Sequence, residues 1–269
     1  MKKTTLILLA ALAFVQAIAQ KLPNVQKASV RAPQSIKIDG KATEWQNKYQ
    51  AYNNATDINY TLANDDKNLY LVIKAARSMV IQGKILSGGI SFTVNHTLNK
   101  KDANAITVTY PVINHKDKDW RLVGDVFNST AFANIEGNSN RDHTPSLTNL
   151  NTAFTKASKY IGVKGIKNVA DNEIPVYNDL NIHAVATFHE PVVYVYELAI
   201  PLKLLALPAG DTKAFSYHIK LNVSKSFSDQ FRAGAVPASG GNLGLEAPPQ
   251  PDPVYLSSTD FWGEYTLAK

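Results

Sequence analysis

The sequence predicts an all-β protein: an immunoglobulin-like or jelly-roll-type β-sandwich of about ten strands with long surface loops. Three observations predict this fold class. Short apolar or alternating segments recur along the chain, clusters of Asn, Asp, Gly and Pro separate them, and a single short segment, residues 201–207, resembles a helical turn. The chain has 269 residues, 45% of them hydrophobic, and no cysteine, so it can bury a core without disulfides.

The predicted strands follow two sequence patterns. Residues 35–39 alternate polar and apolar side chains, and residues 57–63 place three large apolar side chains on one face. The polar cluster at residues 64–68 joins this second strand to residues 69–76, which makes a hairpin. The complete set of predicted strands is 35–39, 57–63, 69–76, 89–95, 105–112, 159–166, 181–188, 192–200, 214–223 and 265–267.

The amino-terminal residues predict a secretory signal peptide. Residues 1–19 contain two lysines, an apolar stretch at residues 6–15 and a small-residue pattern at the end. A membrane anchor is the alternative, but a bilayer span needs roughly 20 apolar residues and this stretch has about 10. We therefore expect a secreted protein, in the periplasm or at the cell surface, in which residues 20–34 lead into a single domain at residues 35–269.

The charge balance does not favour a nucleic-acid partner. The chain has 28 Lys and Arg against 22 Asp and Glu, and it is rich in Asn. Phosphate recognition usually relies on clustered cations with a strong share of Arg. A mild, lysine-based excess is more typical of a solvated polar surface, and no second apolar stretch is long enough to span a membrane.

Two stretches interrupt the strand pattern. Residues 128–154 are rich in Asn, Ser and Thr, and residues 233–253 carry four Gly and five Pro. Both compositions predict surface loops. Such loops either have no role or carry binding residues, as loops of all-β proteins often do.

Five motifs follow one another along the chain. Residues 38–45 read IDGKATEW, residues 65–72 read DDKNLYLV, residues 194–201 read YVYELAIP, residues 215–222 read FSYHIKLN and residues 261–267 read FWGEYTL. In this order they resemble the motifs of family 9 carbohydrate-binding modules. The resemblance implies a secreted immunoglobulin-like β-sandwich that holds a polysaccharide or oligosaccharide. It also implies a role beside glycoside hydrolases that act on the same glycan.

Most of the matching residues predict structural roles. Gly40 suits a tight turn with positive φ, and Asp39 can accept a hydrogen bond from a backbone amide two residues on. Trp45 is expected to cover one end of the sandwich core, with sugar contact as the alternative. Glu197, in an apolar strand, either faces solvent or meets a buried partner such as Arg or Lys, and the buried pair is favoured. Asn222 ends the strand of its motif.

Structural roles are also predicted for the residues of the closing motif and of the acidic turn. Trp262, beside Gly263, matches the packed aromatic residue of the family. The acids within residues 64–68 are expected to form a solvated turn. A calcium site is the alternative, but it would need six to eight oxygen ligands, so the sequence names no metal ligand and predicts no cofactor.

The chain departs from the family where sugar is held. Sugar-binding members clamp a terminal sugar between two Trp rings, whose flat faces suit the apolar face of a pyranose. Residues 78–91, which match the segment of the first ring, contain no Trp and no acid. Tyr255, in the Pro-rich loop, and Trp120, in a charged segment, are therefore the candidate ligand-binding residues. Ordinary packing is the alternative for each.

The sequence contains no pattern of a common catalytic class. HExxH, GxSxG, P-loop and GxGxxG motifs are all missing. Paired carboxylates for glycoside hydrolysis need no local motif, so that alternative stays open. We expect a non-catalytic protein that binds carbohydrate in support of polysaccharide catabolism. The alternative is a surface scaffold that keeps the fold but has lost the sugar site.

Overall fold

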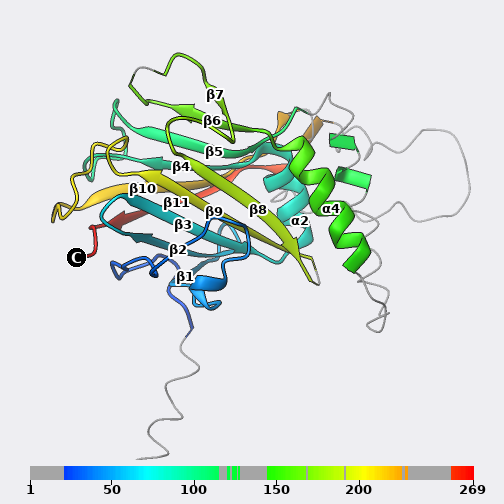
Figure 1. Cartoon of the computed structure of the whole chain (residues 1–269), viewed down its shortest axis with the longest axis horizontal. Coiled ribbons are helices and arrows are strands. Elements are labelled where there is room, and N and C mark those ends of the chain that lie inside the picture. The colour runs from blue at the N-terminus through cyan, green and yellow to red at the C-terminus, as the bar shows by residue number, and fades with distance from the viewer. Residues whose placement is uncertain are drawn as a thin grey trace, which may run out of the picture.

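Two antiparallel sheets pack against each other in the computed structural model, which confirms the predicted β-sandwich (Figure 1). The structure describes residues 21–114, 120–121, 123–125, 127, 144–167, 169–190, 192–225, 228–229 and 256–269. The predicted signal peptide and Tyr255 lie outside these residues. No helix in the described part of the chain is long and apolar enough to cross a membrane.

The first sheet has five strands, and the predicted hairpin lies within it. Strands β2 and β3 pair antiparallel with Leu62 opposite Leu71, so both apolar faces point the same way. Strand β9 lies beside β3 and is buried along almost its whole length. In sheet order the strands are β1 (Ala51–Asn53), β2 (Ile58–Asn64), β3 (Asn68–Ala75), β9 (Val193–Pro201) and β8 (His183–His189).

The second sheet has six strands and a cleaner alternation of buried and exposed residues. Strand β4, for example, buries Ile90, Phe92 and Val94 and leaves the residues between them half-buried. This period of two is the pattern of a sheet with one face on the core and one face in solvent. In sheet order the strands are β11 (Thr259–Tyr265), β10 (Phe215–Leu221), β4 (Ile90–Val94), β5 (Ile106–Val112), β6 (Tyr160–Lys164) and β7 (Glu173–Pro175).

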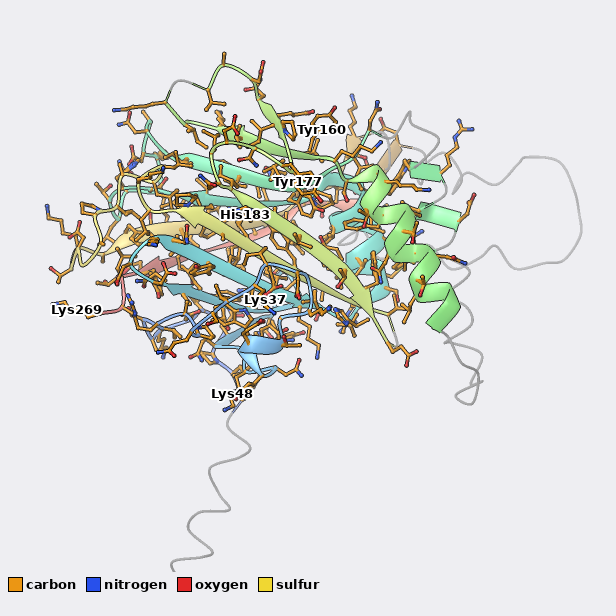
Figure 2. The ribbon with its side chains drawn as sticks, viewed as in Figure 1. Lys37, Lys48, Tyr160, Tyr177, His183 and Lys269 are labelled. Carbon is orange, nitrogen blue, oxygen red and sulfur yellow. The ribbon has the colours of Figure 1, made fainter. Side chains whose placement is uncertain are left out.

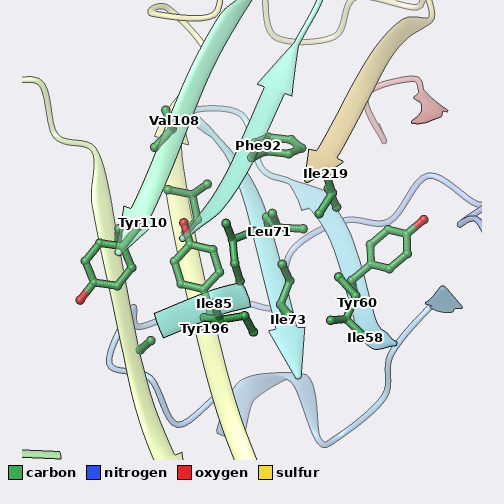
Figure 3. Packing of buried hydrophobic residues seen from close by; sticks show 14 of the residues in the cluster. Ile58, Tyr60, Leu71, Ile73, Ile85, Phe92, Val108, Tyr110, Tyr196 and Ile219 are labelled. Atoms are coloured by element: carbon green, nitrogen blue, oxygen red, sulfur yellow. The ribbon is translucent and has the colours of Figure 1, made fainter. Parts of the chain in front are cut away.

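Large side chains from both sheets fill the space between them (Figure 3). The hydroxyl of Tyr60 in the first sheet lies 2.9 Å from that of Tyr217 in the second, so the two buried phenols satisfy each other. Gly263 makes room for this pair, because a Cβ at that position would stand 2.2 Å from the Tyr217 ring. Gly263 therefore has a structural role, as predicted: it leaves room for the ring of a core tyrosine.

Helical segments close one end of the sandwich (Figure 1). These are α2 (Ser78–Val80), η3 (Ile81–Leu86) and α4 (Thr144–Ala157). The prediction of a surface loop at residues 128–154 is wrong where α4 stands. Leu147, Leu150 and Phe154 follow at intervals of three and four and are buried on one helix face, and the Asn- and Thr-rich composition conceals this spacing.

Three other local predictions differ from the structure. Residues 35–39 form no strand; they cross the outer face of the five-stranded sheet, where Ile36 and Ile38 pack, so their alternation reflects one-sided burial without pairing. Residues 202–206 form successive turns and no helix. The last strand is residues 259–265, earlier than predicted.

Glu197 anchors the amino-terminal segment to the outer face of the five-stranded sheet. Its carboxylate is fully buried and accepts hydrogen bonds from the backbone amides of Asp39 (3.2 Å) and Gly40 (2.8 Å). The indole N–H of Trp45 donates a third bond, at 3.2 Å. The expected partner, a Lys or Arg, is replaced by these N–H donors. Burial raises the pKa of Glu197, and these hydrogen bonds oppose part of the rise.

The turn at Gly40 has the predicted geometry. Its φ is +78°, and a Cβ there would lie 2.6 Å from the Thr187 methyl group, so only glycine fits without strain. Asp39 accepts the Lys41 amide at 3.0 Å, which is the predicted bond two residues on. Trp45 covers the outer face of the sheet, not the end of the core that the sequence suggested.

Asn64 joins the two ends of the described chain. Its side-chain oxygen accepts hydrogen bonds from the Tyr265 hydroxyl at 3.1 Å and from the Ala268 amide at 2.7 Å. The carbonyl of Val30 lies 3.0 Å from the same hydroxyl, whose single proton can point to either acceptor. The segment before β1 and the strand β11 are therefore held at one residue of β2.

The acidic turn after β2 is held by its own amides. Asp65 accepts hydrogen bonds from the amides of Lys67 and Asn68, each at 2.7 Å, and from the hydroxyl of Tyr70 at 2.8 Å. Burial raises the pKa of Asp65, but these three donors outweigh it and the net pKa is lowered. Asp66 is exposed and pairs with Arg31 at 2.9 Å.

We expect Glu197→Gln to lower the free energy of unfolding by about 1–3 kcal/mol, because the amide nitrogen would turn an N–H toward groups that are themselves donors. Urea unfolding measures the loss. Glu190→Gln, a change at an exposed carboxylate, serves as the matched control and should alter stability by less than about 0.5 kcal/mol. Equal stability of the two variants would show that the buried carboxylate does not hold the segment.

We expect Asp65→Asn to lower the stability of the protein at neutral pH. At acidic pH the variant and the wild type should be equally stable. The lowered pKa means that the carboxylate contributes stability above the usual value of 3.8, and that this contribution is lost as the pH falls through the folded-state pKa. Urea midpoints of the wild type and the variant across acidic pH measure this convergence. The control is Asp66→Asn, at the exposed neighbour. If this variant lost as much stability as Asp65→Asn, with the same dependence on pH, the assignment to Asp65 would be wrong.

Candidate functional site

Trp120, one of the two aromatic residues predicted to bind ligand, packs against the interior. Its ring is half-buried and lies against the main core cluster. Residues 120, 123 and 127 are helical, and Val123 and Phe127 are fully buried, so Trp120 lies on the same helix face at intervals of three and four. The exposed platform suggested by its charged neighbours is therefore not what the structure has. Tyr255, the other predicted residue, lies outside the described residues.

Trp262 is on the outer face of the six-stranded sheet, where the sequence suggested interior packing. Phe261, Gly263 and Tyr265 point inward from β11, so the intervening Trp262 points outward. Its ring stacks on His218 of β10, with centroids 4.3 Å apart and planes at 9°. The Nζ of Lys100 lies 5.8 Å from the ring centroid. His218 therefore covers one face of the ring, and Trp262 is half-buried.

The remaining predicted residues have structural surroundings. Asn222 directly follows β10 and donates its side-chain amide to the Ser91 hydroxyl at 2.8 Å and to the Gly89 carbonyl at 3.2 Å. Residues 78–91, the segment of the first clamp ring in the resembled family, run through the buried α2 and η3 into β4. They offer no exposed ring.

Two tyrosines stand out as exposed aromatic side chains. Tyr177 is 93% exposed and Tyr160 is 47% exposed. Tyr160 begins β6 and pairs with Pro175 of β7, and Tyr177 follows Pro175 by two residues in the connection from β7 to β8; Figure 2 labels both side chains. The sequence analysis overlooked them. The available signal was Tyr177 itself, an aromatic residue between Pro175 and a polar turn, with no apolar periodicity to bury it.

A hollow of about 670 Å³ begins beside Tyr160. Val112 of β5 lies opposite Tyr160 in the sheet register and forms one wall. Glu173 of β7 stands on the other side, and Lys156 and Lys159 complete the rim. The hollow combines an aromatic ring, an apolar wall and charged groups.

A second hollow, of about 450 Å³, continues along β6. Its floor is Gly162, which pairs with Thr109 on one side and with Glu173 on the other. Because glycine has no side chain, the surface drops between the neighbouring strands at this point. We call the two hollows together the β6 groove; they are lined by residues 112–114, 156–157, 159–160, 162–164, 172–173, Thr107 and Thr109.

Hydroxyl groups extend from the groove across the outer face of the sheet. Thr107 and Thr93 share a hydrogen bond of 2.8 Å, and Thr109 and Ser91 share another of 2.8 Å. Each hydroxyl can donate one hydrogen bond and accept two, so each pair keeps further capacity for a ligand. Their positions are fixed by the strands, which lowers the entropy lost on binding.

The groove can hold a ligand that offers both an apolar face and hydrogen-bonding groups. Tyr160 supplies aromatic surface, the threonines supply hydroxyls, and Glu173 and the lysines supply charge. In the described part of the chain, no group of three or more His, Asp or Glu side chains is arranged to hold a metal ion.

Comparisons with known proteins assign no family. No family model and no curated protein matches the chain. Among solved structures, it is similar to a carbohydrate binding module family 9 (CBM9) from Caldicellulosiruptor kristjanssonii in complex with glucose, with 13% sequence identity and a TM-score of 0.34. The match covers 75% of this chain and 81% of that chain. A similarity this distant does not identify the ligand of the present protein.

Proposed function

We propose that this is a secreted, non-catalytic protein that binds a polysaccharide or oligosaccharide in the β6 groove. The observation that carries the proposal is Tyr160, an exposed ring at the edge of a groove with a hydroxyl-lined side; the exposed Tyr177 follows the neighbouring strand β7 by two residues. Tyrosine combines an apolar ring with a polar hydroxyl and is enriched at binding interfaces. Support of polysaccharide catabolism, beside glycoside hydrolases at the cell surface or in the periplasm, belongs to the same proposal.

The chemistry of a pyranose matches the groove. One face of the sugar ring presents C–H groups, which stack on a tyrosine ring, while the ring edge presents hydroxyls. Tyr160 would take the apolar face. Thr107, Thr109 and Asn172 would then meet the hydroxyls from the neighbouring hollow. Such a division between stacking and hydrogen bonding fixes the orientation of a sugar chain.

The number of carboxylates along the groove favours sugar binding over glycoside hydrolysis. Glycoside hydrolases typically use two carboxyl groups on opposite sides of the scissile bond. Among the described residues that line the β6 groove, Glu173 is the one carboxylate. A single acid in an open groove can accept hydrogen bonds from sugar hydroxyls but lacks the second group of the usual pair.

We expect Tyr160→Ala and Tyr177→Ala each to weaken glycan binding by about tenfold while the melting temperature changes little, because both rings are exposed and contribute little to the core. Affinity electrophoresis across soluble polysaccharides, followed by calorimetric titration with the best of them, measures the loss.

The matched control is Trp262→Ala, on the same sheet face but with its ring against His218. It should leave binding unchanged. If the wild type binds no glycan, the proposal fails, and a scaffold that has lost the sugar site becomes the better account. If Trp262→Ala alone abolishes binding, the site lies at the other edge of the sheet.

A further inference from the structure

A third hollow, of about 840 Å³, lies beyond the end of β6. The walls of this hollow come from three loops: residues 96–106 between β4 and β5, residues 165–167 after β6, and residues 203–206 after β9. Lys164 and Thr107 are register partners at the end of the groove, and the next residue of each strand, Gly165 and Ile106, lines the third hollow. The three hollows therefore follow one another along β6.

Gly165 lies between the groove and the third hollow, on the path that follows β6 from one to the other. Its φ is +82°, and a Cβ there would stand 2.2 Å from the Ala105 carbonyl oxygen. The chain therefore turns tightly against the neighbouring loop, which only glycine allows without strain. From Tyr160 to Lys167 the path covers seven residue steps, or at most about 23 Å at 3.3 Å per residue, enough for several sugar units.

Lysines accompany this path along its whole length. Lys156 and Lys159 line the first hollow, Lys164 the second, and Lys167 and Lys203 the third. Lys156, Lys159, Lys164, Lys167 and Lys203 are all exposed, and none is a partner in the ion pairs found among the described residues. Five lysine side chains, on β6 and on the segments next to it, thus line the path.

Two carboxylates line the same path. Glu173 stands at the first hollow. Asp102, at the third, has a side chain only 13% exposed, and its oxygens accept hydrogen bonds from the amides of Asn104 (2.9 Å) and His96 (3.1 Å). The His96 ring lies 3.5 Å from the same carboxylate. Asp102 is therefore engaged by its own loop, and cations predominate on the path.

We infer that the glycan bound in the β6 groove is anionic: a linear chain carrying carboxylate or sulfate groups, laid along β6 from Tyr160 to Lys167. This inference rests on the proposed function and names its ligand class. The tyrosines stack the sugar rings, and the lysines meet the acidic substituents at successive positions. Exposed charge pairs are individually weak, so the preference for an acidic glycan comes from several lysines acting together and falls as salt screens them.

The first arm of the test compares probes on the wild-type protein. Polygalacturonate and dextran sulfate represent carboxylate and sulfate glycans, and carboxyl-reduced polygalacturonan and dextran are their neutral counterparts. Poly-glutamate represents a polyanion without sugar. We expect one acidic glycan to bind at least about tenfold more tightly than its neutral counterpart at low salt, with the difference reduced at high salt. Which of the two binds distinguishes carboxylate from sulfate.

The second arm compares two triple variants of equal charge. Lys159→Gln, Lys164→Gln and Lys167→Gln together remove three cations of the path, and we expect a loss of about tenfold or more in affinity for the acidic glycan. Lys27→Gln, Lys37→Gln and Lys48→Gln together remove three exposed cations elsewhere; Figure 2 places Lys37 and Lys48 far from Tyr160. This control should bind like the wild type.

The outcomes separate this inference from the proposed function. Equal binding of acidic and neutral counterparts overturns the anionic ligand and leaves the carbohydrate site standing. Equal losses in both triple variants, or poly-glutamate binding as tight as that of the glycan, also overturn it, because the attraction would then be general to polyanions. Binding to no glycan at all defeats the proposed function itself. A thermal melt of each variant confirms that the fold is retained.

Discussion

A buried carboxylate surrounded by N–H donors organises one whole side of this protein. Glu197 gives up its hydration when β9 enters the sheet, and a buried charge is tolerated only when donors replace the lost water. The donors come from the turn at Gly40 and from Trp45, more than 150 residues away in sequence. Satisfying this one side chain therefore fixes where the segment before β1 lies, and that segment covers the outer face of the five-stranded sheet.

The position of the candidate site follows from this asymmetry between the two sheets. The outer face of the five-stranded sheet carries apolar residues such as Tyr70, Val72 and Val195, which Trp45 and its neighbours bury. The outer face of the six-stranded sheet carries hydroxyls and charges, and its groove lies over β6. One face is thus used for stability, and the other is left free to meet a ligand. A sandwich covered on both faces would have only its loops for binding.

The sequence predicted the sandwich well because strand patterns are local, and it predicted the site poorly because the site depends on register. Alternation located β2 to β6 and β8 to β10, and the motif residues Gly40 and Glu197 were correctly expected to be structural.

Whether Trp262 points inward or outward depends on its parity relative to Phe261, which the motif alone did not reveal. Tyr160 begins β6 and Tyr177 follows β7 by two residues, so their positions depend on the pairing of β6 with β7, which no local sequence pattern shows. Helix α4 was missed because its polar composition outweighed three well-spaced apolar residues.

The junction at Asn64 has a consequence for how the chain acquires its structure. Tyr265 and Ala268 reach Asn64 across about 200 residues of sequence, and Val30 joins them through the Tyr265 hydroxyl. Contacts between such distant residues close large loops, and folds that depend on them form slowly. During synthesis the early strands emerge long before β11 exists, so the amino-terminal segment has no completed place to dock. Until β11 is made, the amino-terminal segment therefore lacks one of its attachments, and incompletely docked apolar surface of this kind is what chaperones recognise.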